Sequence, residues 1–168
     1  MITLAADIGG TRIKLALLRD KSVLARETLD AHSYEGLAPQ LPRMADAFER
    51  LCGAAGTRCT DCAALGVAFP SLVDRASGRI LSEYGKYADA PQIDLPRWAH
   101  EALGLELVIE NDARLALLGE WKAGAGRGRD NLVMVTLGTG LGTSALMEGR
   151  LVRGKHGQAG VLGGHFTV

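Results

Sequence analysis

Two short segments rich in glycine and threonine are the residues of this sequence best suited to bind phosphate. The first is Asp7-Ile8-Gly9-Gly10-Thr11, which ends an apolar run, and the second is 137–143, which lies between two apolar runs. Glycine lets the backbone approach a ligand and turn its N–H groups toward an anion. The first segment alone fits a tight β-hairpin turn about as well as a phosphate site, and one such loop is weak evidence. Two such loops, about 130 residues apart, fit a clamp on the phosphate tail of a nucleotide.

The chemistry around the first loop extends to a metal ion. A carboxylate such as Asp7 can hold Mg²⁺, usually through water, while the hydroxyl and amide of Thr11 can reach phosphate oxygens. The second loop lacks the dinucleotide-binding pattern, because that pattern enters a helix and this loop enters another β run. Dinucleotide binding is therefore disfavoured.

Adjacent Asn111 and Asp112 stand at the end of a predicted strand and just before a predicted helix. α/β sheets expose ligand-binding groups at such positions, and Asp112 there can accept a proton from a hydroxyl that attacks phosphorus. Asp and Asn also cap helices well, although no Glu or Gln stands three residues later to complete a capping box. From these residues alone, a catalytic role and a capping role are equally supported.

Apolar residues follow two periods along the chain, and these predict strands alternating with helices. Three β-rich runs open the sequence as a strand, hairpin and strand pattern, and a helix follows. Strand, helix, strand and helix then alternate, before two last β runs that flank the second glycine-rich loop. The predicted ranges are 2–6, 13–18, 23–29, 36–55, 63–69, 95–103, 105–109, 113–123, 132–137 and 143–147. A flexible break at Gly124–Gly128 predicts a boundary between residues 1–123 and 124–168.

Composition excludes several classes of protein. Lys plus Arg and Asp plus Glu both number 19, so no net charge favours nucleic acid or an anionic membrane, and a small-molecule partner is expected. No apolar run approaches the ~20 residues of a membrane span, and the start lacks a signal peptide, which predicts a cytoplasmic protein. Cys59 and Cys62 form a lone pair without a second ligand pair, so with Cys52 they are expected to be buried or incidental thiols.

Taken in order, the motifs resemble the series found in the ROK family, which are sugar kinases and regulators of the actin-like ATPase superfamily. The matching segments span nearly the whole chain, and their order and spacing are more specific than any one of them. They are Asp7-Ile8-Gly9-Gly10-Thr11, 66–74 with Pro70, Val73 and Asp74, Asn111-Asp112-Ala113, 137–142, and 154–165 with Gly154, Ala159, Gly160, Gly164 and His165.

The resemblance implies an α/β fold, namely an actin-like (ribonuclease H-like) ATPase lobe with a mixed five-stranded sheet and flanking helices, followed by an incomplete second lobe. It implies ATP and Mg²⁺ as cofactors, a hexose or amino sugar as substrate, Asp112 as catalytic base and Asp7 as the metal residue through water. The implied nucleotide-binding residues are Asp7, Gly9, Gly10, Thr11, Gly138, Thr139, Gly140, Gly142 and Thr143. The implied sugar-binding residues are Ser71, Asn111, Asp112 and His165.

Two positions depart from the family pattern. Ser71 stands where the family usually has Gly, which could alter how this loop meets the sugar. The family's Ala-Gly-Glu-x-Gly-His run supplies a Glu and a His, whereas here Ala159-Gly160 is followed by Val161 and the Glu is absent. His165 is equally well explained as the sugar-binding His and as a solvated residue near a chain end.

Family members usually continue with a zinc-binding Cys cluster, adenosine-binding helices and a returning C-terminal helix. None of these precedes Val168, so we expect no zinc in this chain and little kinase activity from these 168 residues without the rest of the parent protein. The few β runs after residue 131 should leave apolar faces such as 132–135 exposed, which predicts cover by a second copy and hence a homo-oligomer.

Two other functions remain in view. ROK proteins include sugar-responsive transcriptional regulators with an N-terminal DNA-binding domain, for which the sequence before Asp7 leaves no room. A non-catalytic sugar-binding remnant is favoured by the early end and by the missing Glu. The main expectation remains ATP-dependent phosphorylation of a sugar by the full-length parent, without nucleic-acid or membrane partners.

Overall fold

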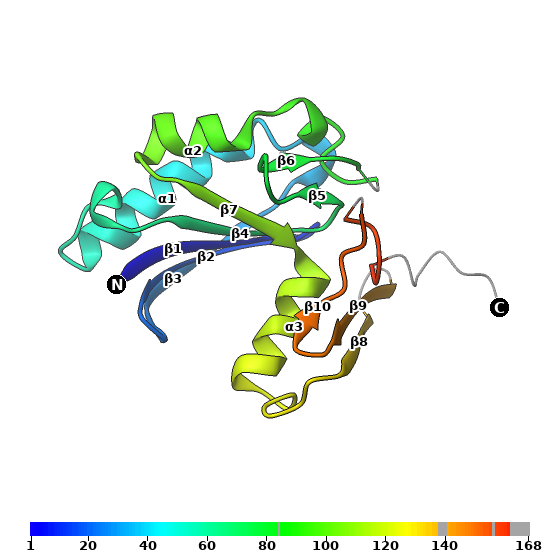
Figure 1. Ribbon diagram of the computed structural model, residues 1–168. Coiled ribbons are helices and arrows are strands. Elements are labelled where there is room, and N and C mark those ends of the chain that lie inside the picture. Colours follow the sequence, from blue (N-terminus) through cyan, green and yellow to red (C-terminus); the bar gives the residue numbers. More distant parts are fainter. Residues whose placement is uncertain (84, 138–140, 156, 162–168) are drawn as a thin grey trace. The chain divides into compact units, whose positions relative to one another are not determined.

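A computed structural model describes residues 1–83, 85–137, 141–155 and 157–161, and so leaves Tyr84, 138–140, His156 and 162–168 outside the description (Figure 1). The chain forms two compact units, Met1–Glu110 and Asn111–Val168. No helix in the described ranges is long and apolar enough to cross a membrane.

The first unit is built on a mixed five-stranded sheet, as predicted. Strands β1 (Ile2–Ile8), β2 (Arg12–Arg19) and β3 (Ser22–Asp30) form an antiparallel meander. Strand β4 (Leu65–Phe69) pairs parallel to β1, and β7 (Leu107–Asn111) lies at the edge, which gives the order β3-β2-β1-β4-β7. The parallel pair places the ends of β1 and β4 at the same edge of the sheet, where α/β proteins bind ligands.

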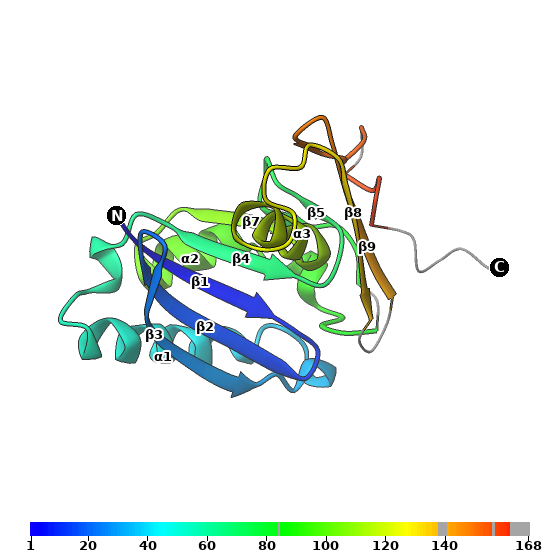
Figure 2. The same cartoon turned by 90° about the horizontal axis from the view of Figure 1, so that it is seen from below.

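Helices α1 (Gln40–Ala54) and α2 (Leu95–Leu103) cover one face of this sheet (Figures 1 and 2). The strands and helices of the first unit are connected by segments that contain five short elements. These are the 3₁₀ turns η1 (Ser33–Glu35), η2 (Cys59–Asp61) and η3 (Ala90–Gln92), and a hairpin of β5 (Val73–Asp74) and β6 (Arg79–Ile80). The sequence pattern did not predict these short elements, because two or three residues carry no period.

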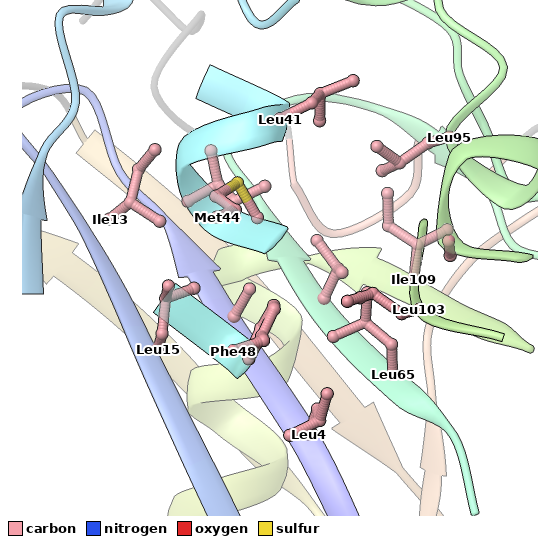
Figure 3. Close-up of a cluster of buried hydrophobic side chains, with 14 of the residues drawn as sticks. Leu4, Ile13, Leu15, Leu41, Met44, Phe48, Leu65, Leu95, Leu103 and Ile109 are labelled. Atoms are coloured by element: carbon pink, nitrogen blue, oxygen red, sulfur yellow. The ribbon is translucent and has the colours of Figure 1, made fainter. Parts of the chain in front are cut away.

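The core of the first unit lies between the sheet and the two helices (Figure 3). Along β2 the apolar side chains alternate with charged ones, so that Ile13 and Leu15 are buried while Arg12 and Lys14 are exposed. Burying apolar side chains contributes about 1.5–3 kcal/mol each relative to exposure. The labelled members of the core in Figure 3 are Leu4, Ile13, Leu15, Leu41, Met44, Phe48, Leu65, Leu95, Leu103 and Ile109.

Helix α1 begins four residues later than the sequence pattern predicts. The backbone N–H groups of Leu37 and Ala38 donate to the carboxylate of Asp89, at 2.6 and 2.9 Å, instead of pointing along a helix axis. Gly36 before them has φ 96°, which no helical residue adopts. Asp89, whose contact delays the start of the helix, lies about 50 positions further along the chain. The local periodicity of apolar residues therefore does not predict this contact.

The three cysteines are buried and free, as predicted. The Sγ atoms of Cys52 and Cys59 lie 3.4 Å apart. Burial raises the pKa of Cys62 to about 11 and that of Cys59 further, so these thiols stay protonated and unreactive near neutral pH.

The second unit consists of one helix and a small antiparallel sheet. Helix α3 (Asp112–Ala123) packs against β8 (Leu132–Leu137) and β9 (Leu141–Met147), and β10 (Arg150–Leu151) completes the order β10-β9-β8. On β8, Val133, Val135 and Leu137 are exposed while the residues between them are half-buried. The units divide after Glu110, and the predicted lobe boundary near residue 123 stays a prediction about the whole protein.

Candidate functional site

The described part of each unit contains part of the predicted site. Asp7, Gly9, Gly10, Thr11 and Ser71 belong to the first unit, and Asn111, Asp112, Gly142 and Thr143 belong to the second. Gly138, Thr139, Gly140 and His165 lie outside the described residues, so their predicted roles in phosphate and sugar binding stay predictions.

The first glycine-rich loop, residues 7–11, forms a tight hairpin turn, which is one of the two interpretations that the sequence left open. It also remains a candidate anion site. It joins β1 to β2, with the N–H of Gly9 donating to the carbonyl of Arg12 at 3.0 Å and the carbonyl of Thr11 accepting from Ala31 N–H at 3.0 Å. A Cβ on Gly9 would lie 2.9 Å from the carbonyl oxygen of Arg12, so a side chain there would force the turn to shift.

The carbonyl groups of this loop are tied back into the first unit. The hydroxyl of Tyr87 donates to the Gly9 carbonyl at 2.7 Å, and the hydroxyl of Ser33 donates to the Gly10 carbonyl at 2.8 Å. In a trans peptide the N–H points opposite to the C=O, so the N–H groups of Gly10 and Thr11 are directed away from Tyr87 and Ser33. Within the described residues, neither N–H has a recorded acceptor. Two adjacent outward N–H groups are what an anion-binding loop requires.

Tyr87 itself is held in an unusual conformation. Its φ is 54°, in the left-handed region that bulky residues rarely adopt, and its side chain is fully buried. Its backbone N–H donates to the Ser33 carbonyl at 2.9 Å, and two residues later Asp89 binds the N–H groups before α1. Burial raises the pKa of Tyr87 to about 12, so its hydroxyl remains a donor at neutral pH.

Asp7 lies at the end of β1, with its side chain 47% exposed. Its Oδ2 is 3.0 Å from Nζ of Lys14, the residue opposite it on β2. A partly solvated carboxylate fits a Mg²⁺ ion that is held through water. No cluster of three or more His, Cys, Asp or Glu side chains capable of holding a metal exists in the described ranges. A single carboxylate such as that of Asp7 suits an ion whose other ligands are water and phosphate oxygens rather than protein side chains.

Ser71 is buried in the bend that connects β4 to the β5–β6 hairpin. The next residue, Leu72, receives a backbone hydrogen bond from Leu81 at 2.8 Å and donates to the hydroxyl of Ser82 at 3.3 Å. These bonds hold the bend at the carboxyl end of β4, one strand away from the glycine loop after β1. A role for Ser71 toward a sugar stays a prediction.

The first turn of α3 distinguishes the roles of Asn111 and Asp112. The Oδ1 atom of Asn111 accepts a hydrogen bond of 3.2 Å from the N–H of Arg114, which makes Asn111 the N-cap of the helix. Asp112 is the first helical residue, and its Oδ1 accepts from Ala113 N–H at 2.7 Å and from Asn111 Nδ2 at 3.1 Å. These two bonds hold the Asp112 carboxylate at the N-terminal end of α3.

Strand β9 lies directly against this turn. The hydroxyl of Ser144 donates to the carbonyl of Ala113 at 2.8 Å. A Cβ on Gly142 would meet the hydroxyl of Thr136 on β8 and would lie 3.5 Å from Cβ of Ala113, so only glycine fits without displacement. Within the second unit, the structure therefore brings Gly142 and Ser144, the two neighbours of Thr143, against Ala113, the residue after Asp112.

A buried arginine, which the sequence analysis missed, joins a third segment to the same turn. Nη2 of Arg114 donates to the carbonyl oxygens of Gly157 and Ala159, at 2.9 and 2.7 Å, and the side chain is only 1% exposed. The segment it holds belongs to the 154–165 motif. The sequence offered one signal of a buried role for Arg114: this charged residue stands between Ala113 and Leu117, on a helix face that should be apolar.

The strand order, the glycine loop after β1 and the polar pair at the start of α3 are those of an actin-like ATPase fold. The sequence model of the ROK family matches residues 3–168. The chain belongs to the ROK family.

Among its relatives is a glucokinase of Halalkalibacterium halodurans, which is 30% identical over 164 residues, or 96% of this chain and 48% of that protein. Among solved structures, the ROK hexokinase of Thermus thermophilus is 32% identical, with a TM-score of 0.79 over 100% of this chain and 54% of the other. The ROK glucokinase of Streptomyces griseus, solved with glucose and AMPPNP, is 28% identical, with a TM-score of 0.77 over 97% and 50%.

A ROK transcriptional regulator, described as a homologue of the Escherichia coli MLC protein, is also similar, with 26% identity and a TM-score of 0.80 over 96% of this chain and 40% of that one. The chain thus spans about half the length of the kinases that it matches. The fold and the family are therefore common to enzymes and regulators.

Proposed function

We propose that the full-length protein transfers the terminal phosphoryl group of ATP to a hydroxyl of a hexose or amino sugar. The observation that carries this proposal is the pair of adjacent polar side chains at the start of α3: Asn111 caps the helix, and the Asp112 carboxylate beside it is the candidate proton acceptor. Similarity to a glucokinase solved with glucose and an ATP analogue supports both substrates. Membership in a family of sugar kinases supports the reaction class.

In this mechanism the residues of the chain position and polarise the reactants. Asp112 accepts the proton of the attacking hydroxyl, and Asn111, Ser71 and His165 contact the sugar. The outward N–H groups of Gly10 and Thr11 bind phosphate oxygens, and the second loop, with Gly138, Thr139, Gly140, Gly142 and Thr143, is a further phosphate-binding segment. Such positioning supplies most of the rate enhancement in phosphoryl transfer.

Magnesium fits the site through Asp7, which would hold the ion by way of water. When bound, the ion neutralises negative charge on the phosphates. Lys14 pairs with Asp7 at 3.0 Å across the β1–β2 hairpin. We propose that the reaction takes place in the cytoplasm, where ATP is available. We also propose that the protein is a homo-oligomer.

A coupled assay that detects ADP tests the proposal. The full-length protein should form ADP with at least one of glucose, mannose, fructose, N-acetylglucosamine and N-acetylmannosamine, and should form little without a sugar. Mass spectrometry of the reaction should show the sugar monophosphate. Absence of ADP formation with every sugar would refute the kinase proposal.

The similarity to a ROK transcriptional regulator supports one alternative, a protein that binds a sugar without phosphorylating it. Sugar binding detected by calorimetry, without any ADP formation, would favour this alternative. ADP formation that depends on the sugar would exclude it.

A further inference from the structure

We propose that Lys86 is a phosphate-contacting residue, whose ammonium group binds the terminal phosphates of the nucleotide beside the glycine loop of residues 9–11. The inference rests on the proposed function, because it specifies a further residue of the same phosphate site. The sequence motifs did not single out Lys86, which lies in the segment between the β5–β6 hairpin and η3.

The side chain of Lys86 occupies the space next to Gly10. A Cβ built on Gly10 would lie 2.6 Å from Cε, 2.7 Å from Cδ and 3.0 Å from Nζ of Lys86. The end of the lysine therefore lies against the loop backbone, which only a residue without a side chain permits. The lysine is half-buried, with the end of its stem and its ammonium group both next to Gly10.

The neighbouring residue fixes this position. Tyr87 is fully buried, with its hydroxyl bound to the Gly9 carbonyl and its N–H bound to the Ser33 carbonyl. It keeps a left-handed backbone, a costly conformation for a bulky side chain. A strained and tightly bonded residue immediately after Lys86 holds the lysine backbone next to the loop, so the side chain's approach to Gly10 is built into the fold.

Lys86 is a cation beside the loop, together with the exposed Arg12 that follows Thr11. Within the part of the chain that the structure describes, no carboxylate pairs with Lys86. The acidic residues of its own segment bind backbone N–H groups, Glu83 that of Gly85 and Asp89 those before α1. Asp7 pairs with Lys14.

This arrangement favours an anion with several negative charges. A lysine ammonium is a compact charge with three donors that binds phosphate oxygens well, and two outward backbone N–H groups lie on the same loop. A polyphosphate tail can contact all three groups at once. A neutral sugar offers no charge for the ammonium.

Isothermal titration calorimetry of the full-length protein with ATP and with inorganic tripolyphosphate tests the inference. The variant Lys86→Met should weaken the binding of both ligands at least about tenfold, as loss of a charge-assisted contact does. Lys86→Arg should restore most of the affinity. Lys21→Met, in the exposed turn between β2 and β3, is the matched control and should bind both ligands like the wild type.

Two further measurements separate a phosphate contact from a structural role. In steady-state assays Lys86→Met should raise the KM for ATP and leave the KM for the sugar unchanged. Gly10→Ala should displace the lysine, so Lys86→Met should add little further loss in that background. Thermal melting of Lys86→Met should match that of the wild type.

The outcomes distinguish this inference from the proposed function. Unchanged tripolyphosphate affinity in Lys86→Met, or no tripolyphosphate binding by the wild type, would overturn the role of Lys86 even if sugar phosphorylation is observed. A changed KM for the sugar alone would also overturn it. Weaker tripolyphosphate binding in Lys86→Met, in a protein that phosphorylates none of the sugars, would support Lys86 while the kinase proposal fails.

Discussion

The hydroxyl of Tyr87 donates a hydrogen bond of 2.7 Å to the carbonyl oxygen of Gly9, a residue 78 positions earlier in the chain. This bond joins the segment after the β5–β6 hairpin to the loop after β1. It orients the peptide between Gly9 and Gly10, and so determines where the N–H of Gly10 points. One buried phenol therefore connects the packing of the first unit to its candidate phosphate site.

Replacement of Tyr87 by Phe should lower the free energy of unfolding by about 1 kcal/mol, the usual net value of a hydrogen bond. Because the Gly9 carbonyl loses its donor, the loop should also bind tripolyphosphate less tightly. Chemical denaturation and calorimetry measure the two effects. Tyr34→Phe is the control, since Tyr34 is 82% exposed and should change stability by less than about 0.5 kcal/mol.

The raised pKa of Tyr87 predicts a loss of stability in alkali. An unfolded tyrosine ionises near pH 10, whereas burial raises the pKa of Tyr87 in the folded state to about 12. Its contribution is therefore fully present below about pH 10 and is lost as the pH rises from about 10 to about 12. Cys59 and Cys62, whose pKa values burial also raises, should add to the loss from about pH 9 upward.

The contribution of Tyr87 can be separated from that of the thiols. The stability difference between the wild type and Tyr87→Phe, followed by urea denaturation, should be constant from about pH 7 to 9 and should narrow above about pH 10. A difference that stays constant up to about pH 12 would show that the phenol ionises in the folded protein as it does in the unfolded chain.

The regular elements of this fold could be predicted from the sequence because their apolar residues repeat locally. The alternation along β2 and the helical spacing of Met44 and Phe48 each lie within one segment, so they predict individual strands and helices. The mixed five-stranded sheet was implied by the resemblance to the ROK family. The glycine loop and the pair before α3 were also found, because their residue types are adjacent in sequence. Their roles in binding and catalysis stay predictions.

The groups that support the site could not be predicted in the same way. Lys86 and Tyr87 meet Gly10 and Gly9 across more than 70 positions, and no periodic pattern records such a contact. Arg114 reaches a segment about 45 positions later, and a single arginine on a helix usually indicates a solvated face. Contacts between segments that tertiary packing brings together have no local signature.

Asp89 should be a strong contributor to the stability of the first unit. Its carboxylate accepts the N–H groups of Leu37 and Ala38, at 2.6 and 2.9 Å, before α1. Asp89→Ala leaves two donors without their acceptor and should cost about 1–3 kcal/mol of unfolding free energy. Asp46→Ala, on the exposed face of α1, is the matched control and should cost less than about 0.5 kcal/mol. Equal effects of the two variants on the denaturation midpoint would contradict this role.

Arg114 should determine the order of the segment that it binds in the second unit. Arg114→Met keeps most of the buried volume but removes the donor to the carbonyls of Gly157 and Ala159. Hydrogen exchange of the Ala159 amide, which donates to the Arg153 carbonyl at 3.0 Å, should become about tenfold faster or more. The exposed Arg127→Met should leave this exchange unchanged. Similar exchange in both variants would mean that other contacts hold the segment.

The roles of Asn111 and Asp112 predict opposite results for two substitutions in the full-length protein. Asn111→Ala removes the N-cap acceptor of Arg114 N–H and should cost about 1 kcal/mol of stability. Asp112→Asn retains an oxygen that can accept from Ala113 N–H, so α3 should keep its first turn and the melting temperature should change little.

Asp112→Asn should nevertheless lower kcat at least about 10²-fold, because an amide cannot accept the proton of the sugar hydroxyl. The affinity for the sugar, measured by calorimetry, should change little, because an amide oxygen can still accept a hydrogen bond from a hydroxyl. The two measurements together separate proton transfer from binding and from folding. Turnover near the wild-type rate in a well-folded Asp112→Asn protein would exclude Asp112 as the base, and would reassign its carboxylate to the hydrogen bonds that it accepts from Ala113 and Asn111 at the start of α3.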